Sequence, residues 1–248
     1  MGGEIDILEN VNDQYPYDLS SIHTTSDCIL PPQSDQTGTT TQYTNCNAKA
    51  GEQTGCRIAL NNTQTVTWGD QLNKMGGGVV AMERDMSQGG KGIRIWMWDA
   101  NSKLPGDVAN PGKTVNPDAW GKPNAHFAIA QCAGQLDEHN VVFDITLCGN
   151  WGNPAYQETP CQQKYGSCGN QVTNMGDTFQ EAYWDVQNLY LYTASGKPVA
   201  GSGSNSGSTS LFARALPGCI AALGAAALVY YICLLYTSPS PRDVEEYR

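Results

Sequence analysis

Between Gly3 and Tyr192, short runs of β-forming residues alternate with loops rich in turn-forming residues, and this pattern restricts the chain to folds built from β-strands. The clearest runs are flanked by Gly, Asn, Asp or Pro and cover residues 79–82, 93–98, 141–146 and 183–192. No convincing amphipathic helix precedes residue 210. The sequence therefore predicts an all-β fold, with two sheets packed as a sandwich.

The charge balance narrows the range of partners. The 248 residues carry a formal net charge of -10, and the isoelectric point is near 4.6. Nucleic acid and anionic membrane surfaces are therefore not expected as partners. Only 15% of the residues are charged, whereas Gly, Asn, Thr, Ser and Gln are abundant. This composition suits an extracellular β protein with many turns, and it is compatible with a neutral ligand rich in hydroxyl groups.

The cysteines indicate disulfide bonds. Nine are dispersed along the chain, with no Cys-x-x-Cys pair and no cluster of histidines. A zinc site is therefore not expected, and disulfides formed in an oxidising compartment are. Cys46 with Cys56 and Cys161 with Cys168 would close short loops, although the sequence does not fix the connectivity. Because the first seven cysteines are an odd number, one of them is expected to lack a partner within the chain.

The composition changes after residue 198. Residues 199–217 read as a flexible linker rich in Gly and Ser. Residues 218–235 form an uncharged apolar run of the length that spans a bilayer, either a transmembrane helix or the tail of a glycolipid-anchor signal. An anchor signal normally ends with its apolar run, but the charged segment 236–248 follows here. Its start resembles a read-through peptide of sequence assemblies, so we interpret this segment as non-native.

The segment GEIDILEN places three carboxylates, Glu4, Asp6 and Glu9, in a strand-like run. On a regular strand Glu4 and Asp6 share one face and Glu9 points to the other. One extra residue between Asp6 and Glu9, accommodated as a β-bulge, would bring Glu9 onto the same face. Three carboxyl groups ordered along one strand face are then predicted.

Carboxyl groups placed in this way suit the hydrolysis of glycosidic bonds. A retaining glycosidase needs two of them ~5–5.5 Å apart, one as nucleophile and one as general acid and base. A third carboxylate between them could share a proton with a neighbour and bias which group is ionised. On spacing alone, a solvent-facing acidic strand or a calcium site explains the three acids equally well.

A family resemblance adds to this interpretation. GEIDILENVN followed by SIHTTSDC resembles the catalytic segment of family-16 glycoside hydrolases, specifically the fungal laminarinase-like endo-β-1,3(4)-glucanases. The likeness covers about residues 2–195 and continues through GGGVVAMERD, GIRIWMWDANSKLPGDV, DAWGKPNAHF, HNVVFDITLCGNWGNPAY and FQEAYWDVQNLYLY. It implies a concanavalin A-like β-jelly-roll sandwich for residues 1–198.

The resemblance also implies roles for single residues. Glu4 would be the nucleophile, Glu9 the general acid/base and Asp6 the assisting carboxylate. His23 matches a histidine near the cleaved bond, although a turn histidine bonded to backbone is an alternative. Trp151 matches an aromatic residue that stacks on a sugar ring, and a core tryptophan is its alternative.

Two further candidates come from the strand run 93–98. Arg94 and Trp96 share one face of this strand and could line the substrate cleft. A buried face between the sheets explains them as well.

By this resemblance, members of the family carry a longer segment before the acidic strand, and that segment supplies strands of both sheets. We therefore expect the domain to be incomplete at its N-terminus, with its natural start upstream of Met1. For the chain by itself we expect weak or no activity.

The sequence thus predicts a retaining endo-β-glucanase that hydrolyses β-1,3- or mixed β-1,3/1,4-glucan. The alternatives are a β-glucan-binding protein without catalysis and a wall-remodelling transglycosylase. The presence of Glu4, Asp6 and Glu9 argues against a binding protein without catalysis. The extra residue between Asp6 and Glu9 argues against a transglycosylase. We expect no cofactor, no metal, a β-glucan as partner and a monomeric state. The protein is predicted to be secreted or held at the cell surface, with membrane anchorage through residues 218–235.

Overall fold

The computed structural model of the protein describes residues 2–11, 17–32, 34–49, 55–61, 64–111, 114–145, 147–197 and 231–232. The predicted linker and the charged tail lie outside these residues, as does the predicted apolar segment apart from two backbone positions. Within the described part of the chain, no helix is both long and apolar enough to cross a membrane. The predictions for the C-terminal segments stay predictions.

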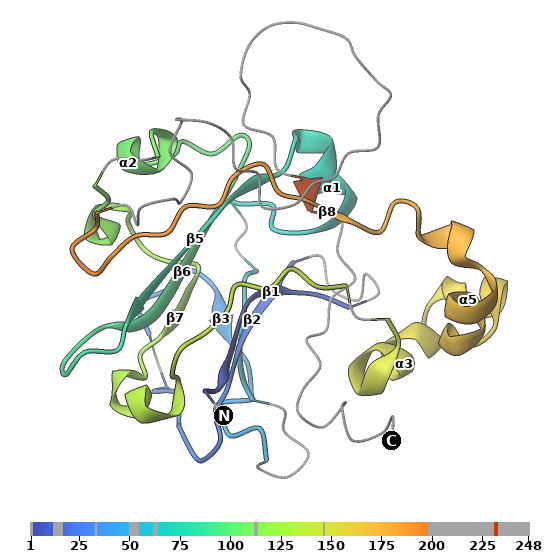
Figure 1. Ribbon diagram of the computed structural model, residues 1–248, viewed down its shortest axis with the longest axis horizontal. Coiled ribbons are helices and arrows are strands. Elements are labelled where there is room, and N and C mark those ends of the chain that lie inside the picture. Colours follow the sequence, from blue (N-terminus) through green and yellow to red (C-terminus); the bar gives the residue numbers. More distant parts are fainter. Residues whose placement is uncertain are drawn as a thin grey trace, which may run out of the picture.

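Four antiparallel strands form the first sheet, in the order β1-β2-β4-β3 (Figure 1). Their bounds are Glu4–Glu9 (β1), Leu19–His23 (β2), Thr39–Thr40 (β3) and Cys56–Ala59 (β4). Ile22 of β2 and Ile58 of β4 are fully buried on one face of this sheet. Because side chains alternate along a strand, their neighbours His23 and Arg57 lie on the opposite face.

The second sheet has three antiparallel strands in the order β5-β6-β7. These strands are Gly78–Asp85 (β5), Gly92–Asp99 (β6) and Ala125–Phe127 (β7). Strands β5 and β6 pair along their whole length, which confirms the strands predicted at 79–82 and 93–98. Along β6, Ile93 and Ile95 are fully buried.

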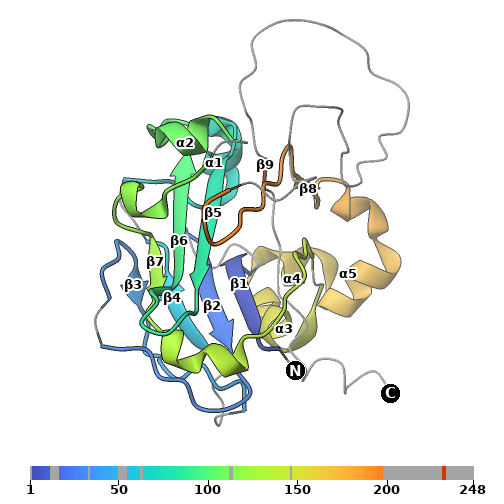
Figure 2. The same cartoon turned by 60° about the vertical axis from the view of Figure 1, so that its left-hand side comes forward.

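The two sheets pack face to face around one apolar core (Figure 2). Ile22 and Ile58 of the first sheet join Ile93, Ile95 and Phe127 of the second in a single cluster. All five side chains are fully buried, and each such residue stabilises the fold by ~1.5–3 kcal/mol. This arrangement confirms the prediction of an all-β sandwich for the described core. It also defines the opposite face of the first sheet, which carries His23 and Arg57, as an outer face.

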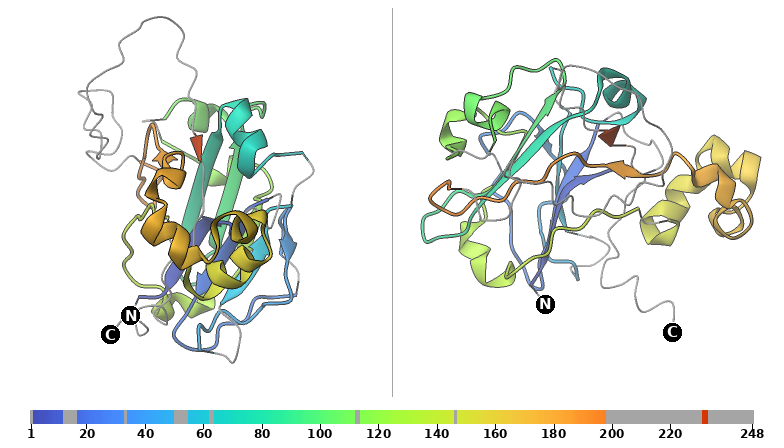
Figure 3. Two further views of the ribbon diagram at one scale, coloured as in Figure 1. Left: turned by 90° about the vertical axis from the view of Figure 1, so that its right-hand side faces the viewer. Right: turned by 45° about the horizontal axis from the view of Figure 1, so that its top comes forward.

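Short helices connect and flank the sheets, and the search of the sequence for amphipathic helices before residue 210 did not predict them. They are α1 to α5, with bounds Gly69–Met75, Gly106–Ala109, Gly149–Gln157, Pro160–Tyr165 and Cys168–Asn174. Short 3-10 helices occupy Pro117–Ala119, Ala130–Gln135 and Gly176–Phe179. Helices α3 to α5 lie together to one side of the two sheets (Figure 3).

Polar side chains cap two helices of this group, α4 and α5. The side chains of Thr159 and Ser167 accept hydrogen bonds from the backbone N–H groups of Cys161 and Asn170, at the starts of α4 and α5. Each cap satisfies a backbone donor that a helix leaves unpaired at its N-terminus.

The predicted strand 141–146 is wrong over its described residues, and the predicted strand 183–192 is confirmed only in part. Residues 141–145 are not in a strand, and of the run 183–192 only Trp184–Asp185 (β8) is, paired with Tyr231–Ile232 (β9). Val141 and Val142 are 53% and 69% exposed, so no neighbouring sheet buries this run. A β-forming run becomes a strand only where another strand offers its backbone groups.

The structure contains three disulfides, at Cys28–Cys132, Cys46–Cys56 and Cys148–Cys168. The predicted pair Cys46–Cys56 is confirmed. The predicted pair Cys161–Cys168 is wrong, because Cys168 on α5 bonds to Cys148 instead. Cys161 is free in the described part of the chain, and it is the odd cysteine that the count predicted.

Candidate active site

A β-bulge in β1 brings its acidic residues onto one face. Glu4 lies opposite His23 and Asp6 opposite Ser21, but the register then shifts by one residue and Glu9 lies opposite Leu19. Three steps along β1 thus match two steps along β2, and Glu9 rotates onto the face of Asp6. The bulge between Asp6 and Glu9 is the one that the spacing of GEIDILEN predicted. We call the outer face that carries Glu4, Asp6, Glu9, Ser21, His23 and Arg57 the acid face.

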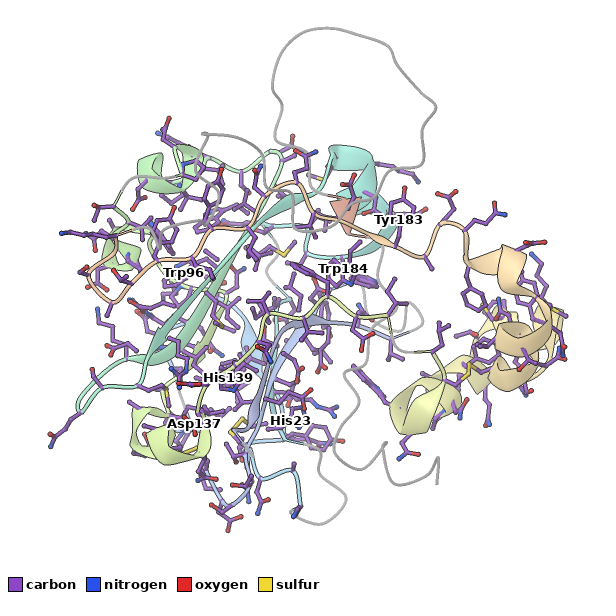
Figure 4. The ribbon with its side chains drawn as sticks, viewed as in Figure 1. His23, Trp96, Asp137, His139, Tyr183 and Trp184 are labelled. Carbon is purple, nitrogen blue, oxygen red and sulfur yellow. A yellow bond between two sulfur atoms is a disulfide. The ribbon has the colours of Figure 1, made fainter. Side chains whose placement is uncertain are left out.

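His23 lies against the middle acid of the acid face. Its Nε2 atom is 2.9 Å from Oδ2 of Asp6, and the Asp6 side chain is almost completely buried. Figure 4 labels His23 at the end of β2. Burial lowers the pKa of His23 below 6.5, the charges of Glu9 and Glu4 oppose this effect, and Arg57 adds to it. The ring is therefore largely neutral near pH 7, where it can exchange protons without carrying a permanent charge.

Glu9 has the surroundings of a general acid. The residue is only 5% exposed, and Ser21 Oγ donates a hydrogen bond to its Oε1 atom. Burial raises the pKa of the Glu9 carboxyl from 4.5 to about 7, and the charge of Asp6 adds to the rise. His23, the Ser21 hydrogen bond and Arg57 lower this pKa. The net result is a carboxyl group that still holds its proton in a large fraction of molecules at neutral pH.

One set of groups could also bind a cation. A carboxylate oxygen from Glu4, one from Asp6 and a ring nitrogen of His23 lie within 4.8 Å of one another. Two carboxylates and an imidazole are suitable ligands for a divalent metal ion. The expectation that the site holds no metal stays a prediction.

Sequence reasoning missed two charged residues near Glu9. Asp18 is 1% exposed, and burial followed by the charge of Glu9 raises its pKa well above 3.8. Arg57 lies opposite Ser21 in the sheet, two strands from Asp6. The alternation Cys56, Arg57, Ile58 places Arg57 on the polar face of its strand, but nothing in the sequence pairs that strand with β2.

The other predicted site residues divide into two groups. Trp151 lies on α3, where its ring is 5.3 Å from the Arg57 guanidinium, so it is brought to the acid face. Arg94 and Trp96 of β6 alternate with the core residues Ile93 and Ile95, which places them on the outer face of the second sheet.

Arg94 and Trp96 have structural partners at that position. Arg94 pairs with Glu83 and Asp118, and Trp96 is 1% exposed and donates its indole N–H to the carbonyl of Gly121. Figure 4 shows Trp96 in the second sheet, apart from His23. The structure does not bring these two residues to the acid face, and their role in substrate binding stays a prediction.

A β-sandwich that gathers three carboxyl groups and a histidine on one face of a sheet has a site for acid–base chemistry at a buried carboxyl. The chain belongs to the family-16 glycoside hydrolases, because the sequence model of a protein family, the XgeA-like, catalytic GH16 domain, matches residues 1–192. This confirms the resemblance seen in the sequence.

Named relatives agree with this assignment. A probable glycosidase of Schizosaccharomyces pombe is 32% identical over 195 residues, which are 77% of this chain and 44% of the relative. An endo-1,3(4)-β-glucanase of Arthroderma benhamiae is 30% identical over 207 residues, 80% of this chain and 43% of the relative. The chain thus spans less than half the length of these two relatives.

A solved structure is similar in fold. The family-16 laminarinase of Phanerochaete chrysosporium, with β-glucans in its donor and acceptor sites, matches at a TM-score of 0.60 and 33% identity. The match covers 72% of this chain and 58% of the laminarinase chain. A mutant of laminarinase 16A that cyclises laminariheptaose matches at a TM-score of 0.58.

Proposed function

We propose that the protein is a retaining endo-β-glucanase that hydrolyses β-1,3- or mixed β-1,3/1,4-glucan. The observation that carries the proposal is the placement of Glu4, Asp6 and Glu9 on one face of β1 by the bulge. Membership of a family whose named relatives include endo-1,3(4)-β-glucanases supports the substrate class.

The two outer acids of the strand differ in a way that suits two roles. Glu9 is buried and its pKa is about 7, so it can donate a proton to the glycosidic oxygen. Glu4 lies at the half-buried start of the strand, opposite His23. We assign Glu4 as the nucleophile that attacks the anomeric carbon and Glu9 as the acid that protonates the leaving oxygen.

The reaction then runs in two steps. Attack by Glu4 breaks the glycosidic bond and forms a glycosyl ester, while the proton of Glu9 moves to the departing sugar hydroxyl. Glu9, now a carboxylate, takes a proton from water, and the resulting hydroxide attacks the anomeric carbon and releases Glu4. The charge of Asp6 raises the pKa of Glu9 and so favours the protonated form needed in the first step.

Further features of the proposal concern the whole protein. We infer that the complete domain is a β-jelly-roll and that the protein acts outside the cell, since three disulfides fit an oxidising compartment. The monomeric state and the membrane anchorage stay predictions.

Hydrolysis of laminarin tests the proposed function directly. We expect the full-length protein to release reducing sugar from laminarin, and Glu4→Gln or Glu9→Gln to lower its rate by roughly 100-fold or more. Glu181→Gln, at an exposed glutamate, is the matched control and should retain the rate. Equal rates for Glu9→Gln and the unmodified chain would contradict the assigned roles.

The stereochemistry is tested by trapping. A 2-deoxy-2-fluoro laminaribioside with a good leaving group should label Glu4, and peptide mass spectrometry should locate the ester on the peptide that contains Glu4. A first product of inverted anomeric configuration would exclude the retaining mechanism. Longer oligosaccharides as the main products would favour the transglycosylase alternative, and binding without turnover would favour a glucan-binding protein.

A further inference from the structure

Arg57 occupies a defined place on the acid face. It lies directly opposite Ser21 of β2, and Ser21 lies opposite Asp6 of β1. Residues directly opposite one another in antiparallel strands project to the same side of the sheet, and adjacent strands are about 4.8 Å apart. The Cα atom of Arg57 is thus roughly 10 Å from that of Asp6, measured across the strands. This direction leads away from β1 along the surface of the sheet.

Two aromatic rings flank the Arg57 guanidinium. Its Cζ atom lies 5.1 Å from the centroid of the Tyr43 ring and 5.3 Å from that of the Trp151 ring. Both distances fall within the range of cation–π attraction. The three side chains come from three separate parts of the chain: the segment between β3 and β4, β4 itself, and α3.

The two rings are held in different ways. Tyr43 is tied to the sheet through its backbone, since its carbonyl accepts a hydrogen bond of 3.0 Å from the Arg57 N–H. Trp151 belongs to the group of helices α3 to α5, which the Cys148–Cys168 disulfide cross-links to itself. The contact with Arg57 therefore joins the ring of Trp151 to the acid-bearing sheet. Figure 3 shows this group of helices beside the first sheet.

The charge of Arg57 reaches the reacting groups as well. It lowers the pKa of both Glu9 and His23, which places the guanidinium within electrostatic range of the acid face. Sugars combine apolar C–H faces, which pack on aromatic rings, with hydroxyl groups, which accept hydrogen bonds from a guanidinium. Tyr43, Arg57 and Trp151 offer both kinds of contact at one place.

We propose that Arg57 is a positioning residue: it holds the ring of Trp151, whose stacking on sugar the family resemblance already implies, at the edge of the acid face, and Tyr43 extends this subsite on the β4 side of Glu9. The subsite takes an uncharged glucosyl unit next to the bond that is cleaved. The inference rests on the proposed function, because it assigns one part of the same substrate.

Oligosaccharide binding in the absence of turnover tests the subsite. The full-length protein carrying Glu4→Gln is titrated with a β-1,3-linked glucose pentasaccharide, and binding is measured by calorimetry. Adding Arg57→Gln should raise Kd about tenfold, and Arg57→Lys, which keeps a cation near the rings, should raise it less than about threefold. Lys74→Gln removes the same charge from an exposed residue of α1 and should leave Kd unchanged.

A double-mutant cycle separates positioning from direct or purely structural effects. If Arg57 acts by holding Trp151, Arg57→Gln should have no further effect on Kd once Trp151→Ala is present. In the active chain, Arg57→Gln should raise KM while kcat changes much less. A full additional loss in the Trp151→Ala background, or a fall in kcat with unchanged KM, would overturn the inference.

The failure of this inference and that of the proposed function have different signatures. If the chain hydrolyses laminarin and Arg57→Gln binds the pentasaccharide as tightly as the parent, the subsite assignment fails and the glucanase assignment stands. If the parent neither binds the pentasaccharide nor hydrolyses laminarin, both fail together. Circular dichroism of each variant identifies any loss of binding that comes from unfolding.

Discussion

The Nε2 atom of His23 lies 2.9 Å from Oδ2 of Asp6, although the two residues belong to different strands. The antiparallel pairing of β1 and β2 creates this contact by placing Glu4 opposite His23 and Asp6 opposite Ser21. Asp6 is the acid whose charge raises the pKa of Glu9, and His23 acts on the same pKa in the opposite direction. The proton affinity of Glu9 is thus set by groups on both strands.

The pH dependence of hydrolysis should report this proton affinity. Because the pKa of Glu9 is about 7 and the first step needs its protonated form, kcat/KM should fall as the pH rises through about 7. Initial rates on laminarin between pH 5 and pH 9 measure this descending limb. A rate that stays constant up to pH 9 would show that Glu9 is not the acid.

The stability of the protein should depend on Glu9 over the same range. The unfolded carboxyl titrates near 4.5 and the folded one near 7, so the folded state loses stability as the pH rises through this interval and reaches a plateau above it. Glu9→Gln removes this loss and should be more stable than the parent above pH 7 by on the order of 3 kcal/mol. Below pH 4.5 the two proteins should be nearly equal. Urea unfolding at pH 4 and pH 8 compares them.

Two neighbours of Glu9 should shift the descending limb in opposite directions. Asp6→Asn removes a charge that raises the pKa of Glu9, so the limb should move to lower pH. Ser21→Ala removes a hydrogen bond that lowers this pKa, so the limb should move to higher pH. The pH profiles of the two variants, measured on laminarin, provide the comparison. A shift of both limbs in the same direction would contradict this account of the acid face.

Local patterns in the sequence predicted the acid strand and its bulge correctly, because the spacing of Glu4, Asp6 and Glu9 within a few residues determines which face each one occupies. The partners on the acid face could not be predicted in the same way. Ser21 and Arg57 reach it through the pairing of β1 with β2 and of β2 with β4, and such pairing depends on contacts distant in sequence.

The helices of the region 149–174 escaped prediction for a related reason. They are short, rich in Gly, Asn and Gln, and specified by capping side chains at Thr159 and Ser167 and by the disulfide at Cys148. None of these features produces the apolar periodicity from which a helix is normally recognised. The same disulfide leaves Cys161 without the partner that spacing alone suggested.

Gly55 should be required for the position of His23. Its φ is 85°, and a Cβ atom at this residue would lie 2.6 Å from Nδ1 of His23 and 2.5 Å from the carbonyl oxygen of Ile22. Gly55→Ala should therefore displace the imidazole from Asp6 and lower kcat/KM by roughly 10- to 100-fold. Gly89→Ala is the matched control, since Gly89 has a φ of 75° but no atom within 4 Å of its Cβ position. The two variants share the backbone strain, so equal activities would show that the contact with His23 is unimportant.

The disulfides should differ in their contribution to stability. Cys28–Cys132 joins residues 104 apart, whereas Cys46–Cys56 joins residues 10 apart. A cross-link that closes a longer loop removes more conformational entropy from the unfolded chain, which amounts to ~4–5 kcal/mol for the long loop and ~3 kcal/mol for the short one. Replacing Cys28 and Cys132 together by Ala should thus lower the free energy of unfolding more than replacing Cys46 and Cys56. Denaturant unfolding of the two double variants measures the difference, with Cys161→Ala as the control that breaks no disulfide. A larger loss for the Cys46 and Cys56 pair would show that local packing, and not the length of the closed loop, decides the stability of this sandwich.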